Sequence, residues 1–394
     1  MIRSVVLVAG VRTPIGDFGK GLKEVPPTRL GALVIAAALA RAGLAPEEVG
    51  HVVMGHVIPT EPRDAYLARV AAVEAGLPAE VPALTLNRLC GSGLEAIVSA
   101  AQRIALGDCD IALAGGAESM SRGAHLLAGL REGVRMGEAK LLDLVLGTLS
   151  DPFGNGHMGI TAENVAAEAG IGRAAQDAFA AESHRRAARA QAEGRFASQI
   201  VPVHIPARKG ETVVAQDEHV RADATADSLA ALRPAFARDG SVTAGNASGL
   251  NDGAAAVVLM AEETAAARGL VPLGRLVAYA HAGVAPRVMG LGPIPAVRRA
   301  LDRAGLAIAD IDVIEANEAF AAQACAVAAE LGFPPERTNP NGGAVALGHP
   351  VGATGAILMV KLLHELARTG GRRGLATMCI GGGQGIAAIV ERPS

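Results

Sequence analysis

Aromatic residues are scarce in this chain of 394 residues, which contains no tryptophan, two tyrosines and seven phenylalanines. This scarcity argues against the recognition of nucleic acids by base stacking. A formal net charge of -3 also excludes a strongly basic surface overall, while leaving room for local basic patches. Since half of the residues are hydrophobic, the core must be built from alanine, valine, leucine and isoleucine. We expect no nucleic-acid partner.

Cysteine is also rare, and none of the four cysteines forms a C-x-x-C pair. Their number and spacing fit neither a disulfide framework nor a zinc ribbon. Histidine and cysteine do not cluster at the spacing of metal ligands, so we expect no metal site. A reduced, cytosolic environment is the simpler inference. The four residues are Cys90, Cys109, Cys325 and Cys379.

Long hydrophobic runs are missing as well, because no apolar stretch reaches membrane-spanning length without glycine or charge. Residues 4–10 form a short apolar run that predicts a buried strand and is too short for a secretion signal with its flanks. The C-terminal residues 391–394 are not a peroxisomal address. We therefore expect a soluble, cytoplasmic protein with no membrane partner. Its length predicts two or three domains.

An internal repeat organises the chain. Residues 38–44 match residues 300–306 at an offset of 262, from Ala38 to Ala300, and differ only at the third position. The same offset places Gly91-Ser92-Gly93 on Ala353-Thr354-Gly355, where a glycine-rich turn opens a helix in each copy. Apolar residues recur at helical spacing after both turns. They are Leu94, Ile97, Val98, Ala101 and Ile104 in the first copy, and Ala356, Met359, Val360, Leu363 and Ala367 in the second.

Strand and helix alternate in each copy, which predicts two α/β halves with mixed sheets. Residues 121–250 have no counterpart in the other copy and read as an inserted loop domain, the usual place for ligand contacts. We expect an N-terminal half at 1–120, completed by 251–270, the loop domain at 121–250, and a C-terminal half at 271–394.

The most informative residue is Cys90, which lies between Leu89 and Gly91 immediately before an apolar helical stretch. A thiol at the start of a helix lies near unpaired backbone N–H groups and the positive end of the helix dipole. Both favour the thiolate. The neighbouring glycines let a bulky ligand approach the backbone. We therefore expect a nucleophile here.

Three further segments carry reactive side chains at the end of a predicted strand or the start of a predicted helix. His349 could take the proton of Cys90, as in the Cys–His pairs of covalent catalysis. Cys379 suits a base that acts on a carbon acid next to a thioester. Asn317 is a neutral donor for a water or an oxyanion. Backbone N–H groups of Cys90 and of the glycine loop after Cys379 could bind a thioester oxyanion.

Each of these residues also has an ordinary structural interpretation. Cys90 and Cys379 could be small core residues, His349 a turn residue, and Asn317 a helix N-cap. Cys109 and Cys325 are interpreted as core or surface thiols. Taken singly, none of these residues decides between the two interpretations.

Together, however, the motifs resemble the thiolase family, the acyl-CoA:acetyl-CoA C-acyltransferases. They occur in the family's order and span nearly the whole chain. The resemblance implies the thiolase fold, with two duplicated α/β halves in an α-β-α-β-α layered arrangement and an inserted loop domain. The motifs are Cys90-Gly91-Ser92-Gly93, residues 115–120, His157-Met158-Gly159, residues 245–253, Asn317-Glu318-Ala319-Phe320, Gly348-His349-Pro350 and residues 379–383.

The resemblance also implies a two-step, ping-pong mechanism. Cys90 is acylated, and Cys379 then removes a proton from the α-carbon of acetyl-CoA, or returns one in thiolysis. His349 activates Cys90 and lines one oxyanion hole with a water held by Asn317. The N–H groups of Cys90 and Gly381 line the other hole.

By the same resemblance, CoA is a substrate and no cofactor is permanently bound. Arg221 is the natural partner of the nucleotide end of CoA. The family also implies a homodimer or homotetramer. The residues expected near CoA are His157, Met158, Arg221, Ser228, Phe236, Ala247, Ser248 and Phe320.

Within the family, residues 60–67 are most similar to bacterial short-chain β-ketothiolases. Phe153-Gly154-Asn155-Gly156 stands where strict acetoacetyl-CoA thiolases tend to place bulky aromatics, which predicts a site open to longer acyl chains. One alternative is a decarboxylating β-ketoacyl synthase, although Cys379 stands where that class has a third histidine or an asparagine. Another is a non-catalytic acyl-CoA-binding homologue, although neither the nucleophile nor the base is lost.

Overall fold

The computed structural model describes residues 3–134, 136–208 and 210–393. Within these residues the main element is a ten-stranded sheet, nine strands of which follow one path while β2 (Gly16–Asp17) pairs with β10. The order along the path is β4 (Ala83–Leu86), β3 (His51–Gly55), β5 (Ile111–Ser119), β10 (Asn251–Ala261), β1 (Val5–Arg12), β11 (Gly274–Gly283), β14 (Gln384–Glu391), β13 (Arg373–Ile380) and β12 (Val313–Ala316).

The sheet consists of two halves in which four strands share one topology, while β4, parallel to β3, extends the N-terminal half by one strand. In the N-terminal half, β3 and β5 are parallel, and β5, β10 and β1 follow as antiparallel neighbours. In the C-terminal half, β12 and β13 are parallel, and β13, β14 and β11 are antiparallel neighbours. Among the residues that the structure describes, the two halves of the sheet pair where Val6 and Leu7 lie opposite Arg275 and Gly274. The prediction of duplicated α/β halves is therefore confirmed.

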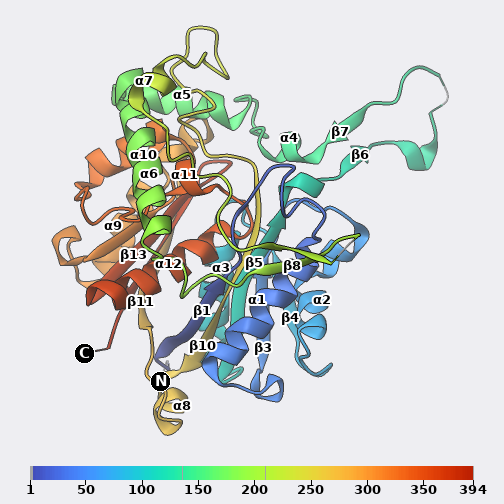
Figure 1. Cartoon of the computed structure of the whole chain (residues 1–394), viewed down its shortest axis with the longest axis vertical. Coiled ribbons are helices and arrows are strands. Elements are labelled where there is room, and N and C mark those ends of the chain that lie inside the picture. The colour runs from blue at the N-terminus through green and yellow to red at the C-terminus, as the bar shows by residue number, and fades with distance from the viewer. Residues whose placement is uncertain (1–2, 135, 209, 394) are drawn as a thin grey trace.

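Helices cover both halves and separate them. The inner helices α3 (Ser92–Leu106) and α12 (Thr354–Thr369) contact each other between the two halves of the sheet. Helices α1 (Pro27–Ala42) and α2 (Leu67–Glu74) cover the outer face of one half, and α9 (Pro293–Ala304) covers that of the other. These layers give the expected α-β-α-β-α arrangement (Figure 1).

Alternation along the strands divides the core. On β10, Ala255, Val257 and Leu259 face α3 and α12, whereas Val258 and Met260 face the outer side with α1. This is the period of two that a strand imposes. The resulting inner core lies directly behind the N-termini of α3 and α12.

Helix α12 differs from its predicted pattern in one respect. Met359, Val360 and Leu363 are buried as expected, but Ala367 is exposed in the last turn. Leu358 and Leu362, which lie off the predicted face, are also buried. The reason is that α12 packs against both sheet halves and against α3, so a single apolar face does not describe it.

The N-termini of α3 and α12 meet at two glycines that occupy equivalent repeat positions. A Cβ atom on Gly93 would lie 2.6 Å from the backbone nitrogen of Ala356, and one on Gly355 would collide with the backbone nitrogen of Leu94. No residue with a side chain fits either position without moving the backbone. The chain segments that precede the two helices are thereby brought together.

The segment between β5 and β10 holds the inserted elements. Helix α6 packs on α7, α10 (Ala321–Leu331) and α11 (Ala344–Leu347), and the β6–β7 hairpin projects from the body of the molecule (Figure 1). No helix in the described part of the chain is long and apolar enough to span a membrane. The inserted elements are β6 (His125–Leu127), β7 (Leu141–Asp143), α4 (Leu144–Thr148), α5 (Met158–Ala169), α6 (Arg173–Ala192), β8 (Val203–Pro206), β9 (Glu211–Val214) and α7 (Ala226–Ala230), and α8 (Glu262–Ala267) follows β10.

Candidate active site

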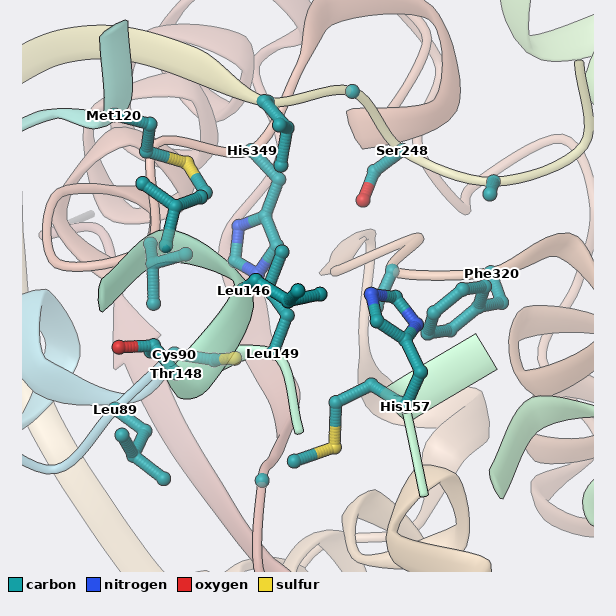
Figure 2. Close-up of a pocket in the computed structure, with 18 of the residues that line it drawn as sticks. Leu89, Cys90, Met120, Leu146, Thr148, Leu149, His157, Ser248, Phe320 and His349 are labelled. Carbon is teal, nitrogen blue, oxygen red and sulfur yellow. The ribbon is translucent and has the colours of Figure 1, made fainter. Parts of the chain in front are cut away.

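A cavity of about 480 Å³ lies where the two halves meet the inserted segment. Cys90 and His349 both line it, and Figure 2 shows their side chains pointing into the same space. The wall is mostly apolar. The remaining lining residues are Leu89, Met120, Asp143, Val145, Leu146, Thr148, Leu149, His157, Met158, Ala235, Phe236, Ala244, Ala247, Ser248, Gly249, Leu250, Met289, Ala319, Phe320, Val351 and Gly381.

Cys90 lies in a tight turn between β4 and α3. The preceding residue, Leu89, has a φ of +46°, a conformation that leucine rarely adopts. Gly91 is the N-cap of α3, so the helix begins at Ser92, two residues after the thiol. A Cβ on Gly91 would lie 2.5 Å from the end of the Ile380 side chain, so a larger residue here requires Ile380 to move. The turn exposes the sulfur to the cavity while the backbone is packed from behind.

The environment of the Cys90 sulfur differs from the sequence expectation. Burial raises the pKa of the thiol above its usual value, and the backbone N–H groups of Gly381 and of Cys90 itself oppose this shift without cancelling it. The backbone donors favour the thiolate, as expected, since both lower the pKa. Desolvation of the anion outweighs the helix-end donors. Cys90 needs a base to react.

His349 has the properties of such a base. The ring is buried, and burial lowers its pKa to about 4, so the imidazole is neutral near pH 7. Its Nδ1 lies 2.6 Å from the hydroxyl of Thr354. Its Nε2 is buried and has no hydrogen-bond partner among the described residues. Nδ1 is thus engaged by Thr354, whereas no hydrogen-bonding group of the described chain engages Nε2.

Cys379 and Asn317 are not among the lining residues, although Cys379 is close enough to Cys90 for a charge there to affect it. Cys379, near the end of β13, is fully buried among apolar residues, and burial followed by a charge on Cys90 raises its pKa well above the usual value. Asn317 is buried just after β12, and neither polar atom of its amide has a partner in the described chain. It is not a helix N-cap, because α10 begins at Ala321 with Phe320 as its cap.

Six of the eight residues expected near CoA line the cavity. The rings of His157 and Phe236 stack at 4.7 Å, and Phe236 meets Phe320 edge to face at 6.2 Å. Arg221 and Ser228 are exposed and outside the lining, and Ser228 closes the N-terminal cap of α7 with Thr225. The six lining residues are His157, Met158, Phe236, Ala247, Ser248 and Phe320.

Part of the cavity wall was not predicted. Val145, Leu146 and Leu149, which belong to α4 and its end, line the cavity. Their presence could have been suspected from the mostly apolar sequence of residues 141–149. By contrast, residues 153–156, which suggested an open acyl pocket, are not among the lining residues, and the side chain of Phe153 is 69% exposed.

Among residues 3–134, 136–208 and 210–393, no group of three or more histidine, cysteine, aspartate or glutamate side chains is placed to hold a metal ion. The polar groups nearest the Cys90 sulfur include the neutral imidazole of His349 and the backbone N–H groups of Cys90 and Gly381. A thiol nucleophile and an imidazole base in one cavity are typical of enzymes that form covalent acyl intermediates.

Comparison with known proteins agrees with this class. Residues 5–263 match the family described as thiolase, N-terminal domain, and residues 270–392 match thiolase, C-terminal domain. The chain belongs to the thiolase family.

Individual relatives match over the full length. The chain is 62% identical to the beta-ketothiolase BktB of Cupriavidus necator, covering 100% of both chains. It is 54% identical to an acetyl-CoA acetyltransferase of Chromobacterium violaceum, covering 99% of this chain and 100% of the relative. Among solved structures, the Bacillus anthracis acetyl-CoA acetyltransferase has a TM-score of 0.98 at 47% identity, covering 100% of this chain and 99% of that one. A human mitochondrial 3-ketoacyl-CoA thiolase in complex with CoA has a TM-score of 0.96 at 41% identity, covering 100% and 98%.

Proposed function

We propose that the chain is an acyl-CoA:acetyl-CoA C-acyltransferase that catalyses reversible Claisen condensation and thiolysis of short-chain 3-ketoacyl-CoA through an acyl-Cys90 intermediate. The observation that carries the proposal is the shared cavity of the Cys90 thiol and a buried His349 with a free Nε2. Relatives 50% or more identical over the full length are named beta-ketothiolase or acetyl-CoA acetyltransferase.

In the first half-reaction, His349 Nε2 takes the proton of Cys90 and the sulfur attacks the thioester carbonyl of an acyl-CoA. The tetrahedral intermediate collapses with cleavage of the C–S bond to CoA, and the imidazolium returns the proton to the leaving thiolate. Burial of His349 supports this role, because a neutral imidazole is present to accept the proton at pH 7. The products are acyl-Cys90 and free CoA.

In the second half-reaction, the Cys379 thiolate removes a proton from the α-carbon of acetyl-CoA, and the resulting enolate attacks the acyl group on Cys90. A C–C bond forms, the C–S bond to Cys90 breaks, and the 3-ketoacyl-CoA leaves. The raised pKa of Cys379 suits a strong base for a carbon acid, and its thiol proton must first pass to solvent. Cys90 is released as a thiolate and takes one proton back from solvent through His349, so the cycle begins and ends with two thiols. Thiolysis runs the same steps in reverse.

Two oxyanion sites assist these steps. We propose that the N–H groups of Cys90 and Gly381 bind the oxyanion formed from the acyl group. Both groups already approach the Cys90 sulfur. Asn317 and His349 form the other site, with a water on the amide of Asn317. The two unpartnered amide atoms of that buried side chain support this assignment.

CoA is the substrate, and no cofactor is permanently bound. We propose that its pantetheine end lies along His157, Phe236 and Ser248, where ring faces and a hydroxyl line the cavity. Arg221 meets the nucleotide end. The apolar wall from α4 supports acyl groups longer than acetyl. Measurable thiolysis of 3-ketovaleryl-CoA beside acetoacetyl-CoA is the expected result, and negligible activity on the longer substrate would contradict it.

The activity is tested by the loss of the 3-ketoacyl-CoA enolate absorbance when free CoA is added. The wild-type chain should consume the substrate, and Cys90→Ala should not. Equal rates in the two would contradict the assignment of Cys90, whereas binding without turnover in the wild type would favour a non-catalytic homologue. Release of CO₂ from a malonyl thioester would favour the decarboxylating alternative.

We also propose that the chain works in the cytoplasm as a homodimer or homotetramer. Two features support self-association: the edge strand β4 has no strand partner on its outer side within the described chain, and the projecting β6–β7 hairpin exposes apolar side chains. Light scattering after size exclusion distinguishes the two states, and a monomer at micromolar concentration would contradict both. The exposed side chains are Leu126, Leu130, Val134, Met136, Leu141 and Leu142.

A further inference from the structure

Two buried hydroxyls occupy the same position in the two copies of the repeat. Ser92 is the first residue of α3 and Thr354 is the first residue of α12, at the repeat offset of 262. Each follows a loop that carries one of the two reactive side chains in the cavity. Because Gly93 and Gly355 let the helix starts touch, these loops face each other across the junction of the two halves.

Ser92 closes the loop that carries Cys90. Its hydroxyl donates to the carbonyl of Leu89 at 2.7 Å and accepts from the N–H of Arg88 at 2.8 Å. Leu89 is the residue held at a φ of +46°. Residues in such conformations persist where surrounding contacts over-determine them. The hydroxyl therefore stabilises the conformation that directs the sulfur into the cavity.

Thr354 closes the loop that carries His349, and it has a second effect. Its hydroxyl donates to the carbonyl of Pro350 at 2.9 Å, which uses its single proton. The oxygen can then only accept at the 2.6 Å contact with His349 Nδ1. This direction of the Thr354 hydrogen bond assigns the proton of His349 to Nδ1 and leaves the lone pair on Nε2.

Neighbouring groups hold this loop without competing for the ring. The side chain of Asn251 accepts the backbone N–H of His349 at 2.8 Å, and Glu118 accepts the N–H of Gly352 at 2.8 Å. Glu118 is also the one carboxylate that contributes a charge effect on Cys90. No side-chain carboxylate within the described residues hydrogen-bonds to the His349 ring, so Thr354 is the group that selects its tautomer.

We propose that Ser92 and Thr354 are a matched pair of positioning residues, Ser92 for the Cys90 turn and Thr354 for the Nδ1–H tautomer of His349. The proposal rests on the roles of Cys90 and His349 proposed above. Neither hydroxyl reaches the substrate; each acts through the side chain that does. The two positions differ in consequence, because loss of Ser92 displaces the nucleophile whereas loss of Thr354 impairs the base.

The test of Thr354 compares Thr354→Val, which keeps the shape and removes the hydroxyl, with Thr354→Ser, which keeps the hydroxyl. Removing the partner of a buried donor predicts a fall in kcat of about ten- to a hundredfold for the valine variant, with KM for CoA within about twofold. The serine variant should stay within about threefold of wild type. Thr369→Val is the matched control, since that hydroxyl donates to the Glu365 carbonyl at the opposite end of the same helix.

A second readout separates the base from a merely structural role. The rate of Cys90 alkylation by iodoacetamide is measured against pH. Thr354→Val should move the midpoint of this profile to higher pH, because an imidazolium without its Nδ1–H acceptor stabilises the thiolate less. Ser92→Ala should lower the rate while leaving the midpoint in place, and Ser92→Thr, which introduces the residue of the other copy, should restore the rate.

Histidine ¹⁵N NMR on the wild-type chain tests the tautomer even where a variant does not fold. The ten histidines are labelled, and the His349 signals are identified by their loss in His349→Asn. We expect a protonated Nδ1 and an unprotonated Nε2; the opposite tautomer would overturn the proposal. So would a wild-type kcat and alkylation profile in Thr354→Val. If His349→Asn itself keeps wild-type turnover, the proposed role of the base fails instead, and the two failures are thus distinguished.

Discussion

The side chain of Asn251 lies directly beneath Gly348, and its Oδ1 accepts the backbone N–H of His349 at 2.8 Å. The same amide donates to the carbonyl of Gly16 at 3.1 Å. One residue at the start of β10 therefore connects the N-terminal segment with the loop of the proposed base. Gly348, at a φ of +104°, leaves the room that this side chain occupies.

Replacement of Asn251 should therefore affect stability and turnover together. Asn251→Ala leaves two buried backbone groups without partners, so the free energy of unfolding should fall by about 2–4 kcal/mol and kcat by tenfold or more. Denaturant unfolding and steady-state thiolysis are the measurements. Asn164→Ala serves as the control, because that amide makes its hydrogen bond to Arg287 near the surface. Equal effects of the two substitutions would contradict this role.

Loss of Cys379 should separate the two half-reactions. Cys379→Ala is expected to retain acetyl transfer from acetyl-CoA to Cys90, because that step uses His349. Condensation and thiolysis should fall by about a hundredfold or more, as for the loss of a general base. Mass spectrometry of the acetylated chain and the enolate assay report the two steps. An unacetylated Cys379→Ala variant would show that Cys379 also acts in the first half-reaction.

Adding one carbon at Gly355 should prevent the inner helices from meeting. Its Cβ would collide with the backbone of Leu94, which cannot rotate away as a side chain could. We expect Gly355→Ala to lower the free energy of unfolding by about 3 kcal/mol or more. Gly172→Ala, with open space around the new carbon and an ordinary φ of -70°, should remain within about 1 kcal/mol of wild type. Thermal or urea unfolding compares the two.

The stability of the chain should depend on pH through His184. Burial, followed by the charges of His219 and Arg221, lowers the pKa of His184 to about 4. Above pH 6.5 the residue is neutral in both states and contributes no pH dependence. As pH falls from 6.5 to about 4 the unfolded chain binds a proton that the folded chain does not, so stability is lost at about 1.4 kcal/mol per pH unit.

His184→Gln isolates this contribution from those of other groups. Over the same pH range, the unfolding free energy of the wild-type chain should fall more steeply than that of the variant. Urea unfolding at pH 7, 6 and 5 measures both slopes. Parallel slopes would mean that His184 does not change its protonation between the two states.

The repeat made much of this fold predictable, because the 262-residue offset linked two helix starts to two reactive loops. The glycines at 93 and 355 were visible in the sequence as equivalent repeat positions. Only the packed structure shows that each lies against the backbone of the other inner helix. The burial of α12 on all sides from Thr354 to Leu363 was likewise hidden, since periodicity describes a helix with one covered face.

The reactive residues were visible as motifs, but their protonation was not. The helix-end argument for Cys90 considered local donors and omitted the cost of desolvation, which depends on distant chain segments. The roles of Thr354 and Asn251 depend on which neighbour uses which proton, and spacing in the sequence carries no such information. Residues of α4 in the cavity wall were missed because the fold of an unrepeated insertion has no internal template.

The glycine contact at the junction joins two halves whose active-site loops carry different side chains. Across the repeat, Cys90 corresponds to Gly352 and His349 corresponds to Asn87. Two identical halves would repeat the pairing, because under twofold symmetry a contact between positions 90 and 349 implies an equivalent contact between positions 352 and 87. Because the two copies lie in one chain, their sequences can differ, so that one copy supplies the thiol of Cys90 and the other supplies the imidazole of His349. A single cavity, rather than two equivalent ones, is the result.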